Sequence, residues 1–176
     1  MDYTLKFPLS EMGELAGRYV EKNRDQPDED KIEREVGPAV MQRGWYTKSE
    51  FLFVCRWKTP RTQSRCAQND EEYIREITSI ALASSNERLR IEALTLLEGV
   101  SWPTASVLLH FAHAERYPIL DFRALESLGI PMPNDYDFRF WKNYVETCRE
   151  VASKAGVTMR TLDRALWQHS SERRRA

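Results

Sequence analysis

Apolar residues recur along most of the chain at the three- and four-residue spacing of amphipathic helices, and no stretch alternates as a half-buried strand does. The pattern therefore predicts an all-α fold, a compact helical bundle without internal repeats. The expected helices cover approximately residues 10–19, 47–58, 73–83, 87–97, 102–112, 122–128, 138–155 and 158–169.

Capping signals set several of these boundaries. Thr47 and Glu50 have capping-box spacing ahead of FLFVCRWK, and Pro60 disfavours helical geometry at the residue before it, so this helix should end near residue 58. Asn69 and Glu72 repeat the spacing before YIREITSIALA. Ser10 is expected to cap the first helix, whose inner face carries Met12, Leu15 and Tyr19. The inner face of the helix YIREITSIALA is expected to carry Tyr73, Ile77 and Ile80.

The segment ASVLLHFA has almost no polar face, so its helix should lie at the centre of the fold, with Pro103 in the first turn. Gly156 suits the end of the helix 138–155. In the last helix, Arg160 and Arg164 are expected outside an inward stripe formed by Met159, Leu162, Ala165, Leu166 and His169. The charged stretch 21–35 is expected to be a solvated connection or an exposed helix.

Composition narrows the class of protein. A chain of 176 residues, 41% of them hydrophobic, fits one globular domain over 1–176, with a flexible basic tail over 170–176. Three cysteines fit neither a disulfide framework nor a four-ligand metal cluster, and no apolar run reaches the length of a membrane span. We expect a cytoplasmic protein without cofactor or metal. The net charge of −1 excludes a uniformly basic surface, so nucleic-acid contact requires local sites.

The stretch GVSWPTAS, Gly99 to Ser106, joins two expected helices through only Gly99, Val100 and Ser101. Gly99 supplies the backbone freedom that a sharp turn needs. Such a turn leaves the first amides of the second helix unpaired at the positive end of the helix dipole, where they can hold a phosphate oxygen. A weakly acidic protein can therefore still bind DNA here.

The segment LLEGVSWPTASVLLHFAHAERYPILDF resembles the helix-hairpin-helix region of the base-excision DNA glycosylase superfamily. Asp121, 22 residues after Gly99, takes the position of that family's catalytic aspartate. The resemblance covers about residues 88–128, and the hairpin positions that match are Leu97, Gly99, Val100, Thr104 and Ala105.

Several positions depart from the family pattern. Ser101 replaces the second hairpin glycine, and Phe-Arg-Ala-Leu follows Asp121 in place of a Thr-His-containing sequence. Pro103 stands where bifunctional members carry a Schiff-base lysine, and no four-cysteine iron–sulfur cluster follows. The resemblance therefore implies a divergent, monofunctional enzyme that hydrolyses the N-glycosidic bond of an altered base in double-stranded DNA.

Asp121 has two interpretations. A fixed carboxylate can stabilise the positive charge that develops on the sugar, or help a water molecule attack it. Alternatively, Asp121 only caps the helix 122–128. His110 and His113 share a helix face, but no neighbouring cysteine or carboxylate completes a metal site, so we interpret them as structural.

Two further groups are candidates for DNA contact. The stretch RWKTPRTQSR, 56–65, has four positive and no negative side chains; it suits a phosphate-contacting loop or, equally, a helix end that favours cations.

A flipped base needs aromatic walls, although each aromatic residue is individually more typical of a core. The DNA-binding candidates are Gly99, Ser101, Trp102, Thr104, Lys58, Arg61 and Arg65; the base-pocket candidates are Tyr46, Trp57, Phe122 and Trp141. Two other function classes stay open: a non-catalytic DNA-binding module with the same hairpin, and a helical interaction protein whose hairpin only packs.

Overall fold

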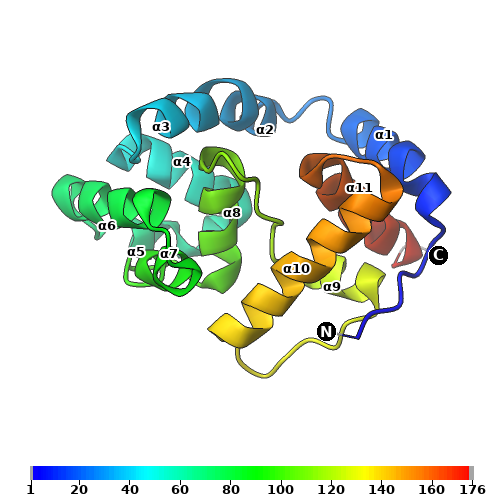
Figure 1. Ribbon diagram of the computed structural model, residues 1–176. Coiled ribbons are helices and arrows are strands. Elements are labelled where there is room, and N and C mark those ends of the chain that lie inside the picture. The colour runs from blue at the N-terminus through cyan, green and yellow to red at the C-terminus, as the bar shows by residue number, and fades with distance from the viewer. Residues whose placement is uncertain (1, 175–176) are drawn as a thin grey trace. The chain divides into compact units, whose positions relative to one another are not determined.

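The computed structural model describes residues 2–174, and every regular element within that range is helical (Figure 1). This confirms the predicted all-α fold class. The chain divides into two compact units, unit 1 with Met1–Gln26 and Pro118–Ala176 and unit 2 with Pro27–Tyr117, and each is described by itself. The single domain over 1–176 stays a prediction. Among the described residues, no helix is both long and apolar enough to cross a membrane.

Unit 1 is built around its last helix. α11 (Met159–Arg173) packs against α1 (Met12–Lys22), α9 (Phe122–Leu128) and α10 (Phe138–Ala155). The first residues of the chain run along the end of α9, where the amides of Thr4 and Lys6 donate to the carbonyls of Leu128 and Ser127 over 2.8 and 2.9 Å. Gly156 ends α10 in the left-handed region with φ +65°, as predicted.

Some predicted boundaries in unit 1 were wrong. Ser10 is not a helix cap: it lies in a 3-10 turn, η1 (Leu9–Glu11), and Glu11 is the N-cap residue of α1. α11 continues beyond residue 169 to Arg173, and Ser170 is buried and donates to the Glu126 carboxylate over 2.6 Å. The flexible tail predicted over 170–176 is therefore wrong for residues 170–173, which are helical, and positions 175–176 lie outside the described range. Arg160, expected outside, is buried and pairs with Asp163 over 2.8 Å.

Unit 2 surrounds α8 (Trp102–Ala112), which packs against α3 (Gly37–Arg43), α4 (Lys48–Lys58) and α7 (Glu87–Leu94) (Figure 1). Every residue of α8 from Thr104 to Ala112 is buried. The central position predicted for this helix is therefore confirmed. The remaining elements of the unit are α2 (Pro27–Lys31), a π-helical turn η2 (Ile32–Val36), a 3-10 turn η3 (Pro60–Thr62), α5 (Gln63–Cys66) and α6 (Glu71–Ala83).

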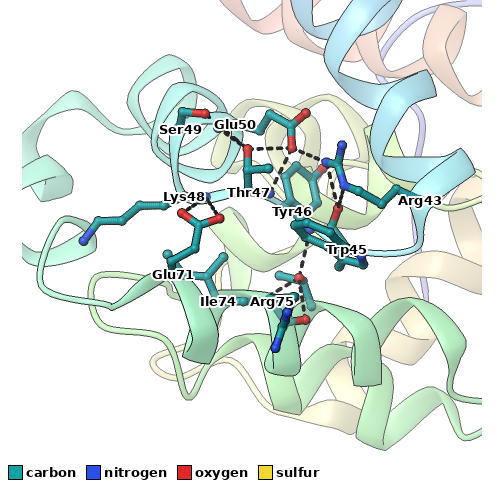
Figure 2. A network of polar contacts seen from close by, with 11 residues as sticks. Arg43, Trp45, Tyr46, Thr47, Lys48, Ser49, Glu50, Glu71, Ile74 and Arg75 are labelled. Carbon is teal, nitrogen blue, oxygen red and sulfur yellow. Dashed lines mark hydrogen bonds and ion pairs between the residues drawn. The ribbon is translucent and has the colours of Figure 1, made fainter.

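The predicted capping box of α4 is present (Figure 2). The hydroxyl of Thr47 accepts from the amide of Glu50 over 3.3 Å, and the Glu50 carboxylate accepts from the amide of Thr47 over 2.9 Å. Arg43 donates to the same carboxylate and, over 3.0 Å, to the carbonyl of Trp45. The turn between α3 and α4 is therefore fixed by charged groups as well as by the cap, and α4 ends at Lys58 as expected.

The start of α6 differs from the prediction. Asp70, not Asn69, is its N-cap residue and accepts from the amide of Tyr73 over 2.7 Å. The helix is also rotated relative to the expected face: Tyr73 and Ile80 are exposed, whereas the buried residues are Ile74, Ile77, Thr78 and Ala81. The charged stretch 21–35 contains helical turns with inward residues, since Glu29 and Ile32 are buried.

Candidate nucleic-acid interface

The connection between α7 and α8 is longer than three residues. α7 ends at Leu94 rather than near Leu97, so the connection runs from Thr95 to Ser101; we call it the hairpin loop. Leu97 and Val100 are buried and anchor it to unit 2, and the amide of Val100 donates to the Leu97 carbonyl over 3.1 Å. The loop is therefore a defined turn with an apolar underside.

Gly99 is required at its position for two reasons. Its φ is +80°, in the left-handed region that side chains disfavour. A Cβ atom there would lie 2.7 Å from Sγ of Cys66 and 2.8 Å from the Cys66 amide nitrogen, closer than atoms can pack. The turn and the contact with α5 thus both exclude a side chain, which explains the glycine more fully than the turn alone does.

Asn69 holds the loop from the other side. Its Oδ1 accepts from the amide of Glu98 over 2.8 Å, while its Nδ2 donates to the carbonyls of Glu98 and Cys66 over 3.0 and 2.9 Å. Asn69 itself is 4% exposed. A buried amide side chain therefore pairs both backbone groups of the residue that precedes Gly99.

The sulfur beneath Gly99 belongs to a pair. Cys66 and Cys55 are both free and buried. The hydrogen bond from Cys55 lowers the pKa of the Cys66 thiol to about 6, while the same bond, with burial, raises the pKa of Cys55 well above its ordinary value. The Cys66 sulfur thus lies directly beneath Gly99, with the Cys55 thiol as its hydrogen-bond partner.

Ser101 ends the loop and is the N-cap residue of α8, but its side chain makes no capping hydrogen bond. Ser101 is exposed, and Pro103 in the first turn has no amide to satisfy. The first amides of α8 therefore receive nothing from the residue that normally caps them. An outside acceptor can take that place.

A pocket of about 210 Å³ opens beside these atoms. Arg65 lines this pocket, and its guanidinium lies 3.3 Å from the exposed carboxylate of Glu98. Three of the predicted DNA-binding residues line this pocket: Gly99, Ser101 and Arg65. The other four do not line it: Lys58, Arg61, Trp102 and Thr104. Of these, Thr104 is buried. The lining comprises Thr62, Arg65, Thr95, Leu96, Leu97, Glu98, Gly99, Val100 and Ser101.

Asp121 begins α9 in unit 1 and acts as its N-cap. Its Oδ1 accepts from the amide of Arg123 over 2.9 Å, and the residue is half-buried. Burial, followed by the negative charge of Asp121, raises the pKa of Tyr136. The carboxylate thus caps its own helix, a structural role that does not depend on catalysis.

The comparisons with known proteins do not decide a function. No family model and no curated protein matches the chain. Its structure is similar to the Methanocaldococcus jannaschii 8-oxoguanine glycosylase/lyase, solved in complex with a 15mer DNA containing 8-oxoguanine. The two are 17% identical with a TM-score of 0.47, over 93% of this chain and 82% of the other. At these values the likeness assigns neither a family nor an activity.

The aromatic candidates for a base pocket occupy different surroundings. Tyr46 is 1% exposed and donates its hydroxyl to the Leu108 carbonyl over 2.9 Å. Its amide donates to Thr78 Oγ1 over 3.0 Å. Trp57, also in unit 2, packs edge-on against Phe111. In unit 1, Trp141 is buried and Phe122 is 40% exposed. Of the four, Phe122 has the most accessible ring.

The two histidines of α8 and its end have hydrogen-bond partners. His110 is buried, and its Nδ1 lies 2.6 Å from the Tyr117 carbonyl. His113 Nε2 lies 2.6 Å from Nη1 of Arg90. Within residues 2–174 no three histidine, cysteine or carboxylate side chains gather as a metal site would require.

Sequence reasoning missed Asn69 and Cys66 as parts of the hairpin. Asparagine is a residue type favoured at helix N-caps, and only the folded chain shows that Asn69 bonds to Glu98. Its neighbour Asp70 was the available signal, because two adjacent capping residues cannot both cap one helix.

Proposed function

We propose that the protein binds double-stranded DNA through the hairpin loop and hydrolyses the N-glycosidic bond of an altered base, as a divergent helix-hairpin-helix glycosylase. The observation that carries the proposal is the uncapped, exposed start of α8 at Ser101, held by Gly99 beside a pocket that contains Arg65. Helix N-termini of this kind bind phosphate oxygens through backbone amides. The protein's net charge of −1 makes such a local site necessary for DNA binding.

The resemblance assigns catalysis to Asp121. As the bond between C1′ and the base nitrogen breaks, the base leaves with the electron pair and positive charge develops on the sugar. The carboxylate stabilises this charge, and it can accept a proton from the water whose oxygen bonds to C1′. Pro103 offers no amine for a Schiff base, so the product is an intact strand with an abasic site.

Binding is tested most sharply at Ser101. Ser101→Asp places a carboxylate where the phosphate is expected, yet aspartate is itself a favourable N-cap residue, so the fold should be retained. Ser101→Asn is the matched control, because it has the same shape without the charge. Fluorescence anisotropy with a labelled duplex should show at least about tenfold weaker binding for the aspartate variant than for the asparagine variant, a loss of about 1.4 kcal/mol. Equal affinities would remove the hairpin from the interface.

Catalysis is tested with duplexes that carry a panel of altered bases. Asp121→Asn should abolish excision and retain lesion binding, because the amide keeps the cap but lacks the charge. Strand scission of the wild-type product should appear only after alkali or heat. Full excision by the asparagine variant would contradict the assignment, as would a covalent protein–DNA adduct trapped by borohydride.

A DNA-binding module without catalysis is the second candidate function. The hydrogen bond from the Arg123 amide favours it, because capping α9 already accounts for an aspartate at this position. Duplex binding that is equal for damaged and undamaged DNA, with no excision of any base, would establish this alternative.

A further inference from the structure

Cationic and aromatic side chains alternate along one surface of unit 1. Lys22 of α1 lies 4.7 Å from the ring centre of Trp167 on α11, and the Arg123 guanidinium lies 4.9 Å from the same ring. Arg123 also lies 5.1 Å from the ring of Phe122, which Arg174 approaches to 4.8 Å. We call these five residues the cation–aromatic row.

Arg123 has a special place in this row. Arg174 forms an ion pair with Glu126 over 3.0 Å, whereas the Arg123 guanidinium has no carboxylate partner among residues 2–174. Stacking against two rings orients a guanidinium but does not satisfy its N–H groups. The positive charge of Arg123 is therefore held in place without a counter-charge from the described chain.

The guanidinium of Arg123 has one covered and one open edge. Its Nη1 is buried and has no hydrogen-bond partner. Nε and Nη2 are not among the buried unpaired atoms, and the residue as a whole is half-buried. Nε and Nη2 together present the two parallel N–H groups that bind a phosphate or carboxylate in bidentate fashion. The accessible edge thus has the donor geometry of an anion-binding arginine.

We propose that Arg123 binds a backbone phosphate of the DNA strand next to Asp121 and so positions the sugar for that carboxylate. The inference rests on the proposed function and adds to it a second phosphate contact, on unit 1, independent of the hairpin loop. The hydrogen bond of 2.9 Å between Asp121 and the Arg123 amide keeps the two residues on one rigid turn. A phosphate bound by the side chain of one is therefore held at a fixed offset from the carboxylate of the other.

The test compares Arg123→Met with wild type in duplex binding over a range of salt concentrations. Methionine keeps an unbranched stem between the rings and removes the charge. Because each neutralised phosphate contributes about 0.9 to the slope of log affinity against log salt, the slope should fall by about one unit. Arg139→Met is the matched control, since Arg139 is an exposed arginine of α10 in the same unit, and its slope should equal that of wild type.

A second variant covers the case in which Arg123→Met does not fold. Arg123→Lys keeps the charge but loses the two-pronged donor edge, so it should retain the salt slope and bind several-fold more weakly. Wild-type affinity and slope in whichever variants fold would overturn the inference and leave Arg123 as a stacking residue.

Two further outcomes separate this inference from the proposed function. If Ser101→Asp weakens binding and Arg123→Met does not, the hairpin binds DNA and Arg123 does not contribute. If inorganic phosphate at constant ionic strength competes strongly with the duplex for wild type but not for Arg123→Met, the site takes free phosphate and the inference fails. A wild-type protein with no salt-dependent duplex binding contradicts both.

Discussion

The hairpin loop and the turn at Asp121 each place a candidate residue at the start of a helix, but they are held in different ways. The hairpin loop depends on residues far away in the sequence: Asn69 pairs with Glu98, and Cys66 lies against Gly99. Asp121 depends on its own helix, through the amide of Arg123. Long-range contacts thus fix the proposed binding element, whereas a local cap fixes the proposed catalytic one.

This difference predicts unequal sensitivity to mutation. A substitution beneath the hairpin loop disturbs packing between elements of unit 2, while a substitution at Asp121 disturbs one helix end of seven residues. Four measurements, in decreasing order of expected effect, can confirm or remove the contrast.

Gly99→Ala should have the largest effect on stability. The left-handed backbone and the clash with Cys66 together should cost about 3 kcal/mol in the free energy of unfolding. Gly156→Ala is the control, because Gly156 has φ +65° but nothing lies within 4 Å of its would-be Cβ. That variant should lose only about 1 kcal/mol. Urea unfolding of both proteins measures the difference, and equal losses would show that the Cys66 contact yields readily.

Asn69→Ala should come next, with a loss of about 2 kcal/mol, because it leaves the amide and carbonyl of Glu98 without their buried partner. Hydrogen exchange at the Glu98 amide should accelerate more than exchange at α6 amides. Asn69→Asp keeps the acceptor for the Glu98 amide but sets a buried carboxylate oxygen against two carbonyl oxygens, so its loss should be at least as large as that of Asn69→Ala. Unchanged exchange at Glu98 would mean that the loop holds itself.

Asp121→Ala should lose about 1 kcal/mol, the usual effect of removing an N-cap, and Asp121→Asn less than about 0.5 kcal/mol. Thermal unfolding measures both. A much larger loss for alanine would show that Asp121 supports more than its own helix, and the contrast with the hairpin loop would then fail.

Mild acid should have the smallest effect and should weaken both units. Burial lowers the pKa of His113, at the end of α8, and of His169, whose Nδ1 lies 2.9 Å from Ser127 Oγ of α9. The folded state therefore binds fewer protons than the unfolded state, so this stability is present above the ordinary pKa of 6.5 and declines as the pH falls below it. Melting temperatures at several pH values between about 7.5 and 5.5 test this window, above the pKa range of ordinary carboxylates.

Replacing each histidine separately assigns the pH effect to a unit. His113→Gln and His169→Gln should each reduce the fall in melting temperature on acidification. A melting temperature that rises as the pH falls would contradict the direction of both pKa shifts.

Local sequence signals predicted much of this molecule. The Thr47–Glu50 capping box, the left-handed glycines at 99 and 156 and the Asp121 cap all depend on neighbours within a few residues, and all are present. Signals of this kind can be recognised in sequence because the interacting groups are separated by a fixed number of residues.

The errors arose where a side chain's partner lies on another element. Asn69 looked like a cap but bonds to the hairpin loop. Arg160 is a different case: its partner Asp163 is on the same helix, and the error arose because other parts of unit 1 bury the arginine. The inward face of α6 was assigned from Tyr73 and Ile80, although its buried stripe includes the polar Thr78, whose hydroxyl accepts from the Tyr46 amide. Polar residues with buried partners resemble surface residues until the chain has folded.

The support beneath Gly99 also limits how the hairpin could be exchanged between proteins. A graft of residues 95–106 onto another helical protein would carry the glycine and the start of α8, but neither Asn69 nor Cys66. The transplanted turn would lose the hydrogen bonds at Glu98 and the surface on which its backbone rests. The shortest segment that contains both the loop and its support is therefore 66–106, which also includes α6 and α7. Recombination within this segment would separate the loop from Asn69 and Cys66.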